Sequence, residues 1–170
     1  EEVFTSPAFT MLRKAIMNFI VGGCIRRLQQ EKQGKKKEDY AFLLHTEMAT
    51  LSHSWQEEVV SKLGEELMKI SRENRTMLNE LVSDSYDDLK NSLTLTKSFY
   101  TEYVDLPIPS LEEIQVAVKN ALDQEMLLVQ KVNYEEDVKA LLDEKGQLRL
   151  RTPLNFFIGG QILDRGITIR

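Results

Sequence analysis

The chain has 170 residues, of which 42% are hydrophobic and 29% are charged, and its formal net charge is −5. This length suffices for one sizeable core, and the acidic balance argues against an overall electrostatic grip on nucleic acid, although a local contact is still compatible with it. A single cysteine, Cys24, rules out an internal disulfide and suits a reducing compartment, so we expect a cytoplasmic protein.

The first predicted helix begins at Ser6-Pro7, with serine as the N-cap and proline in the first turn. Apolar residues and one glycine recur after it at helical spacing: Phe9, Leu12, Ile16, Phe19, Ile20 and Gly23. Gly22-Gly23 would weaken a helix, which is tolerated where another backbone approaches closely. The apolar stretch 15–25 is shorter than the about 20 residues that span a bilayer, so we expect no membrane partner.

A basic cluster follows the first helix, at residues 32–37, with Arg26 and Arg27 just upstream. Two interpretations are open. A solvated loop between two elements is favoured over a patch that contacts phosphate groups.

Residues 40–45 form a short continuous apolar run, which is typical of a strand that is covered on both faces. Residues 46–51 are expected to form a loop. Ser54 and Glu57 have the spacing of a capping box and predict the start of a helix there.

Residues 65–100 predict one long helix, or two helices broken near Ser83-Asp84. The prolines at 107 and 109 predict a loop. Ser110 and Glu113 then form a second capping-box pattern, which leads into a helix that runs to about Leu122.

Residues 126–133 predict a second strand, followed by a short helix at 134–142, a brief edge strand near Leu148 and Leu150, and a last buried strand at 155–158. Strands alternating with helices predict an α/β fold: a small parallel sheet of three to four strands flanked by helices. We expect a single domain over residues 1–170, with residues 65–122 as a helical insertion or subdomain.

The last residues combine the apolar run 155–158, a glycine pair and Arg165-Gly166. Glycine allows close backbone approach, and an arginine side chain can bind phosphate through two hydrogen bonds. The alternative is a structural arginine that is paired with Asp164 or another carboxylate at a tight turn.

Three segments taken in order resemble the Z-one domain, a family found beside superfamily 2 helicase domains in bacterial endonucleases. They are 6–28, which ends in Arg-Arg-Leu; Phe42-Leu-Leu-His45-Thr46 with the helix that carries Gln56; and 158–168, similar to a Gly-Gly and Arg-Gly-Leu-Thr signature. The resemblance covers most of the chain outside the helical block.

The resemblance implies the second RecA-like lobe of an ATP-dependent nucleic-acid enzyme that acts in restriction or phage defence. It implies DNA and the remaining motor and nuclease domains as partners, and ATP and Mg²⁺ as cofactors of the parent protein. The sequence contains no P-loop and no Walker-B strand, so we expect the chain, as a fragment, to hold no cofactor and to catalyse nothing by itself.

Open α/β sheets bind ligands at the carboxyl ends of their strands. Candidate contacts to nucleic acid or nucleotide are therefore the residues at the predicted strand ends, together with the loop that resembles the motor signature. They are His45, Thr46, Asn133, Gly160, Arg165 and Gly166. For His45 and Thr46, an ordinary loop start is an equal alternative.

The sequence does not favour a nuclease site or a metal site. Asp137-Val138-Lys139 matches part of a nuclease motif, but it falls in a predicted helix with no clear partner. One cysteine and two histidines lack the spacing of zinc ligands.

The alternative function is a non-catalytic protein-interaction module that uses the acidic helical block 65–122. An exposed apolar patch would favour it. Tyr100, Tyr103, Leu106 and Ile108 are the candidates for such a patch.

Overall fold

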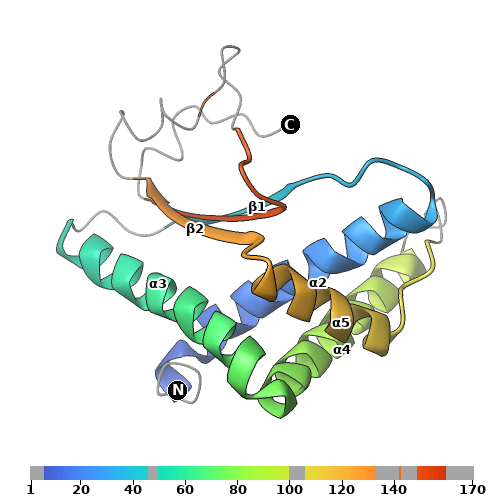
Figure 1. The fold of residues 1–170 in the computed structure, drawn as a ribbon, viewed down its shortest axis with the longest axis horizontal. Helices are drawn as coiled ribbons and strands as arrows, with labels where there is room; N and C mark the ends of the chain where they lie inside the picture. The colour runs from blue at the N-terminus through green and yellow to red at the C-terminus, as the bar shows by residue number, and fades with distance from the viewer. Residues whose placement is uncertain (1–5, 46–49, 100–105, 133–141, 143–148, 160–170) are drawn as a thin grey trace. The chain divides into compact units, whose positions relative to one another are not determined.

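The computed structural model of the chain describes residues 6–45, 50–99, 106–132, 142 and 149–159. They divide into two compact units: residues 1–38 with 66–125 (unit 1), and residues 39–65 with 126–170 (unit 2). Helices and a parallel sheet are both present (Figure 1), so the predicted α/β class is confirmed. The prediction of one domain with an insertion at 65–122 stays a prediction.

Unit 1 begins with a 3-10 helix, η1 (Pro7–Phe9), which continues into α2 (Thr10–Lys32). The side chain of Ser6 accepts a hydrogen bond from the amide of Ala8, which confirms Ser6 as the N-cap. The proline follows it in the first turn, where its missing N–H removes no helical hydrogen bond.

The buried side of α2 is a broad stripe that includes most of its apolar residues: Ile16, Met17, Ile20, Val21, Cys24 and Ile25. By length and composition the helix Pro7–Lys32 would be able to cross a membrane, a test that buried core helices also pass. Because α2 packs against α4 and α5 through this stripe, we interpret it as the core helix of unit 1.

The end of α2 is fixed by Gly34, whose φ of +66° lies in the left-handed region. The amide of Gly34 donates to the carbonyl of Glu31, and the amide of Lys35 donates to that of Gln30 at 2.8 Å. This pair of bonds is a Schellman motif. The basic residues 35–37 therefore follow a defined turn.

Two long helices follow, α3 (Thr50–Glu73) and α4 (Arg75–Phe99). The predicted start at Ser54 is wrong, because α3 begins four residues earlier, with no glycine or proline between to stop it. The predicted break near Ser83-Asp84 is also wrong. The break lies at Asn74, whose side-chain oxygen accepts from the amide of Met77 and so caps α4.

The helix α5 (Leu111–Asp123) begins as the sequence predicts. Ser110 Oγ accepts from the amide of Glu113, and the Glu113 carboxylate accepts from the amide of Ser110. Both halves of the capping box are present. The apolar residues Ile114, Val118, Ala121 and Leu122 are buried in unit 1.

Unit 2 contains three strands, β1 (Tyr40–His45), β2 (Leu127–Val132) and β3 (Leu154–Gly159). The sheet order is β1-β3-β2, and both pairings are parallel. The predicted parallel sheet is confirmed with three strands among the described residues. Residues 149 and 150 are not in a strand, so the predicted edge strand is wrong there.

Neighbouring residues of β3 are buried on opposite faces, since Phe156 and Phe157 are each 1% exposed. The ring of Phe156 stacks on that of Phe42 in β1, with a centroid distance of 5.0 Å. The central strand is therefore covered on both faces, as expected of a parallel sheet.

Candidate functional site

The carboxyl ends of the three strands meet at one edge of the sheet. In the parallel register His45 of β1 lies opposite Gly159 of β3, and Gly159 lies opposite Val132 of β2. The sequence predicted a parallel sheet whose strands end at one such edge. The register confirms this for the ends of β1, β2 and β3. We call it the carboxyl edge, and it is the candidate functional site.

The residues expected to act at this edge come directly after the strands or further along the chain. His45 is the last residue of β1, and its backbone belongs to the sheet. The other five lie outside the described residues, and their contacts stay predictions: Thr46, Asn133, Gly160, Arg165 and Gly166. The nuclease-like segment 135–139 lies outside the described residues as well.

The opposite, amino end of the sheet is organised by a buried asparagine that sequence reasoning missed. Asn155 is fully buried, and its side-chain oxygen accepts from the Thr152 hydroxyl at 3.2 Å. Its side-chain nitrogen donates to the carbonyl oxygens of Thr152 and, at 3.3 Å, of Tyr40. One amide thus joins β1, β3 and the residues before β3. The available signal was an asparagine inside an otherwise apolar strand.

The helix α3 approaches the sheet closely at Gly64, in the part of α3 that belongs to unit 2. A Cβ at this position would come within 3.3 Å of a methyl group of Val129 in β2. Because Val129 lies opposite Phe156 in the register, Gly64 packs on the face that carries the stacked phenylalanines. The glycine makes this close contact possible.

The comparison with protein families decides which class of protein this sheet belongs to. The family model described as the Z1 domain matches residues 11–170, nearly the whole chain. The chain belongs to the Z1 domain family. No curated protein and no solved structure matches it.

Among the described residues of this Z1 domain, no three histidine, cysteine, aspartate or glutamate side chains gather as a metal site would require. The Cys24 thiol is buried within α2, and burial raises its pKa to about 12. At neutral pH this side chain is protonated and packs as an apolar group. The described part of the Z1 domain therefore contains no metal cluster and no activated thiol.

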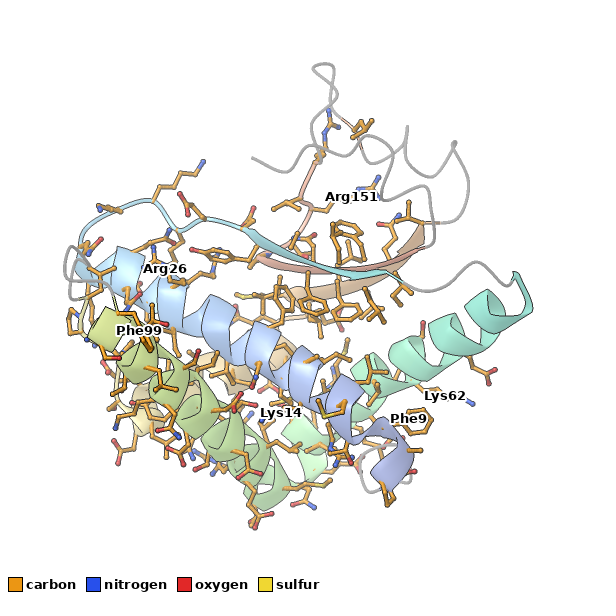
Figure 2. All side chains as sticks on the ribbon, turned by 180° about the vertical axis from the view of Figure 1, so that it is seen from behind. Phe9, Lys14, Arg26, Lys62, Phe99 and Arg151 are labelled. Carbon is orange, nitrogen blue, oxygen red and sulfur yellow. The ribbon has the colours of Figure 1, made fainter. Side chains whose placement is uncertain are left out.

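Charges in the described part of unit 2 include an exposed ion pair on α3. Lys62 Nζ lies 2.7 Å from a carboxylate oxygen of Glu58, one helical turn earlier. The hydrogen bond from Lys62 lowers the pKa of Glu58. Arg151 is exposed and stands just before β3, at the amino end of the sheet (Figure 2). This arginine is a natural control for Arg165, which follows the carboxyl end.

Proposed function

We propose that this Z1 domain is part of the second motor lobe of an ATP-dependent nucleic-acid enzyme, in which the carboxyl edge of the sheet contacts nucleic acid. The observation that carries the proposal is the parallel register, because His45, Gly159 and Val132 end their strands side by side. Loops that leave parallel strands at one edge converge on a common ligand in open α/β sheets.

In this proposal Arg165 binds a phosphate of the nucleic-acid backbone, and Gly166 allows the chain to approach it. A guanidinium group supplies two parallel donors to phosphate oxygens, and adjacent backbone N–H groups add to them. Thr46, Asn133 and Gly160, with His45, are the further contacts, since they end or directly follow the three strands. The chain thereby contributes nucleic-acid contact and coupling to the nucleotide state.

The described residues do not fit an ATP–Mg²⁺ site. The sequence has no P-loop, and the described residues include no acidic cluster that would hold the metal. We therefore assign ATP and Mg²⁺ to other parts of the full-length protein. DNA is the proposed nucleic acid, and restriction or phage defence is the proposed role.

A second candidate function is a protein-interaction module built on the helical block 65–122. One observation favours it: Leu95 and Phe99 on α4 are 64% and 78% exposed. Exposed apolar side chains that are grouped together mark interaction surfaces more often than scattered ones do. Binding of a partner protein through this block would leave the sheet as a scaffold.

The deciding experiment measures DNA-stimulated ATP hydrolysis by the full-length protein, the Arg165→Ala variant and the Arg151→Ala variant. We expect stimulation in the wild type, its loss in Arg165→Ala and its retention in Arg151→Ala, because Arg151 stands at the amino end of the sheet. Circular dichroism establishes that each variant is folded. A well-folded wild type without DNA-stimulated ATPase activity would contradict the motor-lobe proposal.

A further inference from the structure

The helices α2 and α4 bring their C-terminal ends together within unit 1. Asn18 of α2 donates a hydrogen bond to Asp88 of α4 at 2.7 Å, and a Cβ at Gly22 would lie 3.7 Å from Leu89. The order of these contacts makes the helices parallel. At about 1.5 Å per residue, the two helices advance equally from Gly22 and Leu89 to their last residues, Lys32 and Phe99.

The final three turns of α4 expose two large apolar side chains. Leu95 and Phe99 stand one turn apart and are 64% and 78% exposed. The segment 89–99 contains two lysines and no acidic residue. Figure 2 shows Phe99 and Arg26 at the same end of unit 1. The exposed aromatic ring and the basic end of α2 therefore lie at the same end of unit 1 (Figure 2).

The basic loop after α2 is held at both of its ends. The Schellman turn at Gly34 fixes its start, and the side chain of Gln30 fixes its end through two 2.9 Å hydrogen bonds with Glu38. Lys32 pairs with Glu113 at 2.6 Å, and Lys37 pairs with Glu31 at 2.8 Å.

Lys35 and Lys36 are the cations of this loop that are left for a partner. Both are exposed, and neither has a carboxylate within ion-pairing distance in the described part of the chain. The sequence alone favoured a solvated loop. The structure adds an ordered turn before these two lysines and an exposed aromatic ring on the neighbouring helix.

We propose that the ends of α2 and α4 form a second contact surface for single-stranded nucleic acid, with Lys35 and Lys36 at phosphates and the Phe99 ring stacked on a base. This inference rests on the proposed function, which supplies the nucleic acid. Ammonium groups next to an exposed aromatic ring are the combination with which proteins hold single strands without reading their sequence. An acidic protein segment would match the charge but would leave the flat face of the ring without a stacking partner.

The test measures fluorescence anisotropy of a labelled oligothymidylate of about 15 nucleotides, titrated with the 170-residue chain at several salt concentrations. The first variant is Lys35→Gln with Lys36→Gln, and its control is Lys62→Gln with Lys69→Gln on α3. The second is Phe99→Ser, and its control is Met11→Ser, because Met11 is 77% exposed and Phe99 is 78% exposed.

We expect the Lys35/Lys36 variant to reduce the slope of log K against log salt by about 1.4, since each lost phosphate contact in a single strand removes about 0.7. We expect Phe99→Ser to weaken binding by about fivefold or more and to leave the slope unchanged. Both controls should bind like the wild type. A poly-glutamate chain should compete poorly with the oligonucleotide.

The surface is disproved if both variants bind the oligonucleotide like their controls, or if the wild-type chain does not bind it at all. Equal binding of poly-glutamate, with the same loss in Phe99→Ser, would also overturn it and would assign the surface to an acidic protein. These results leave the motor-lobe proposal standing if Arg165→Ala still abolishes DNA-stimulated ATPase activity. If instead Arg165→Ala keeps its DNA-stimulated ATPase activity while the Lys35/Lys36 and Phe99 variants lose oligonucleotide binding, the motor-lobe proposal fails and the surface stands.

Discussion

The hydroxyl group of Tyr86 donates a hydrogen bond to the carbonyl oxygen of Pro109, 2.9 Å away in the interior of unit 1. Tyr86 is 8% exposed and belongs to α4, whereas Pro109 directly precedes the capping box of α5. The bond therefore anchors the start of α5 to α4. It satisfies a buried carbonyl group that lies outside any helix or strand.

Tyr86→Phe removes only this hydroxyl, and we expect it to lower the free energy of unfolding by about 1–3 kcal/mol, because the carbonyl of Pro109 stays buried without a donor. Urea denaturation measures it as a lower midpoint with an unchanged m-value. Thr94→Val is the control, since the Thr94 hydroxyl bonds to its own helix at an exposed position. Equal midpoints for Tyr86→Phe and wild type would show that the bond contributes nothing.

Gly34 and Gly22 give a matched pair of glycine-to-alanine substitutions. Gly34→Ala should destabilise the chain by about 1 kcal/mol, because an L-residue at φ +66° is strained although no atom stands in the way. Gly22→Ala should stabilise it by up to about 1 kcal/mol, since it lies inside α2 and its Cβ would meet Leu89 at an ordinary 3.7 Å. Thermal unfolding of both variants measures the two shifts, and shifts of the same sign would contradict the argument.

The lowered pKa of Asp88 predicts how the free energy of unfolding depends on pH. Hydrogen bonds from Lys14, 2.9 Å away, and from Asn18 lower the pKa of this carboxyl below its ordinary value. A group whose pKa is depressed in the folded state contributes stability above the unfolded pKa, and that contribution is lost as the pH falls through the folded pKa. Below about pH 4, the free energy of unfolding of Asp88→Asn should therefore fall less steeply with falling pH than that of the wild type. Urea midpoints measured at several pH values test this. Parallel curves for variant and wild type would exclude this contribution.

We expect substitution of Asn155 to destabilise the protein more than substitution of any other polar residue in the described sheet. Asn155→Leu removes the donor to the carbonyls of Tyr40 and Thr152 and the acceptor of the amides of Arg151 and Thr152 in the interior. We expect a loss of about 3 kcal/mol or more, or a chain that does not fold. Asn120→Leu, at an exposed position of α5, is the control. Hydrogen exchange of the β1 and β3 amides distinguishes local loosening of the sheet from global unfolding.

Much of the fold follows from local sequence patterns. The run 40–45 is apolar without interruption, and β1 has the predicted bounds. The Ser110 and Glu113 pattern marks a real helix start because two prolines precede it and stop any helix from upstream. The same spacing at Ser54 is misleading, since nothing before it prevents α3 from starting at Thr50.

Other features depend on contacts that local patterns do not encode. The break at Asn74 is made by one side chain in a sequence that is helical on both sides, whereas Ser83-Asp84 only looked like a break. The strand order depends on pairing between distant segments. The carboxyl edge was predictable because strands that alternate with helices run parallel. Most of the contacts proposed for it fall on residues 46, 133, 160, 165 and 166, outside the described residues, and stay predictions.

The sheet order β1-β3-β2 has a consequence for synthesis on the ribosome. Within the described residues, β1 and β2 do not pair with each other, and each pairs with β3, the last of the three described strands to be made. Asn155 and its partner Tyr40 are 115 residues apart in the chain. Until β3 leaves the exit tunnel, β1 and β2 both present unpaired backbone edges, which are the features that nascent chains aggregate through and chaperones protect. A chain that is released before Leu154 is made therefore has the described helices but lacks the strand that joins β1 to β2 in the described sheet.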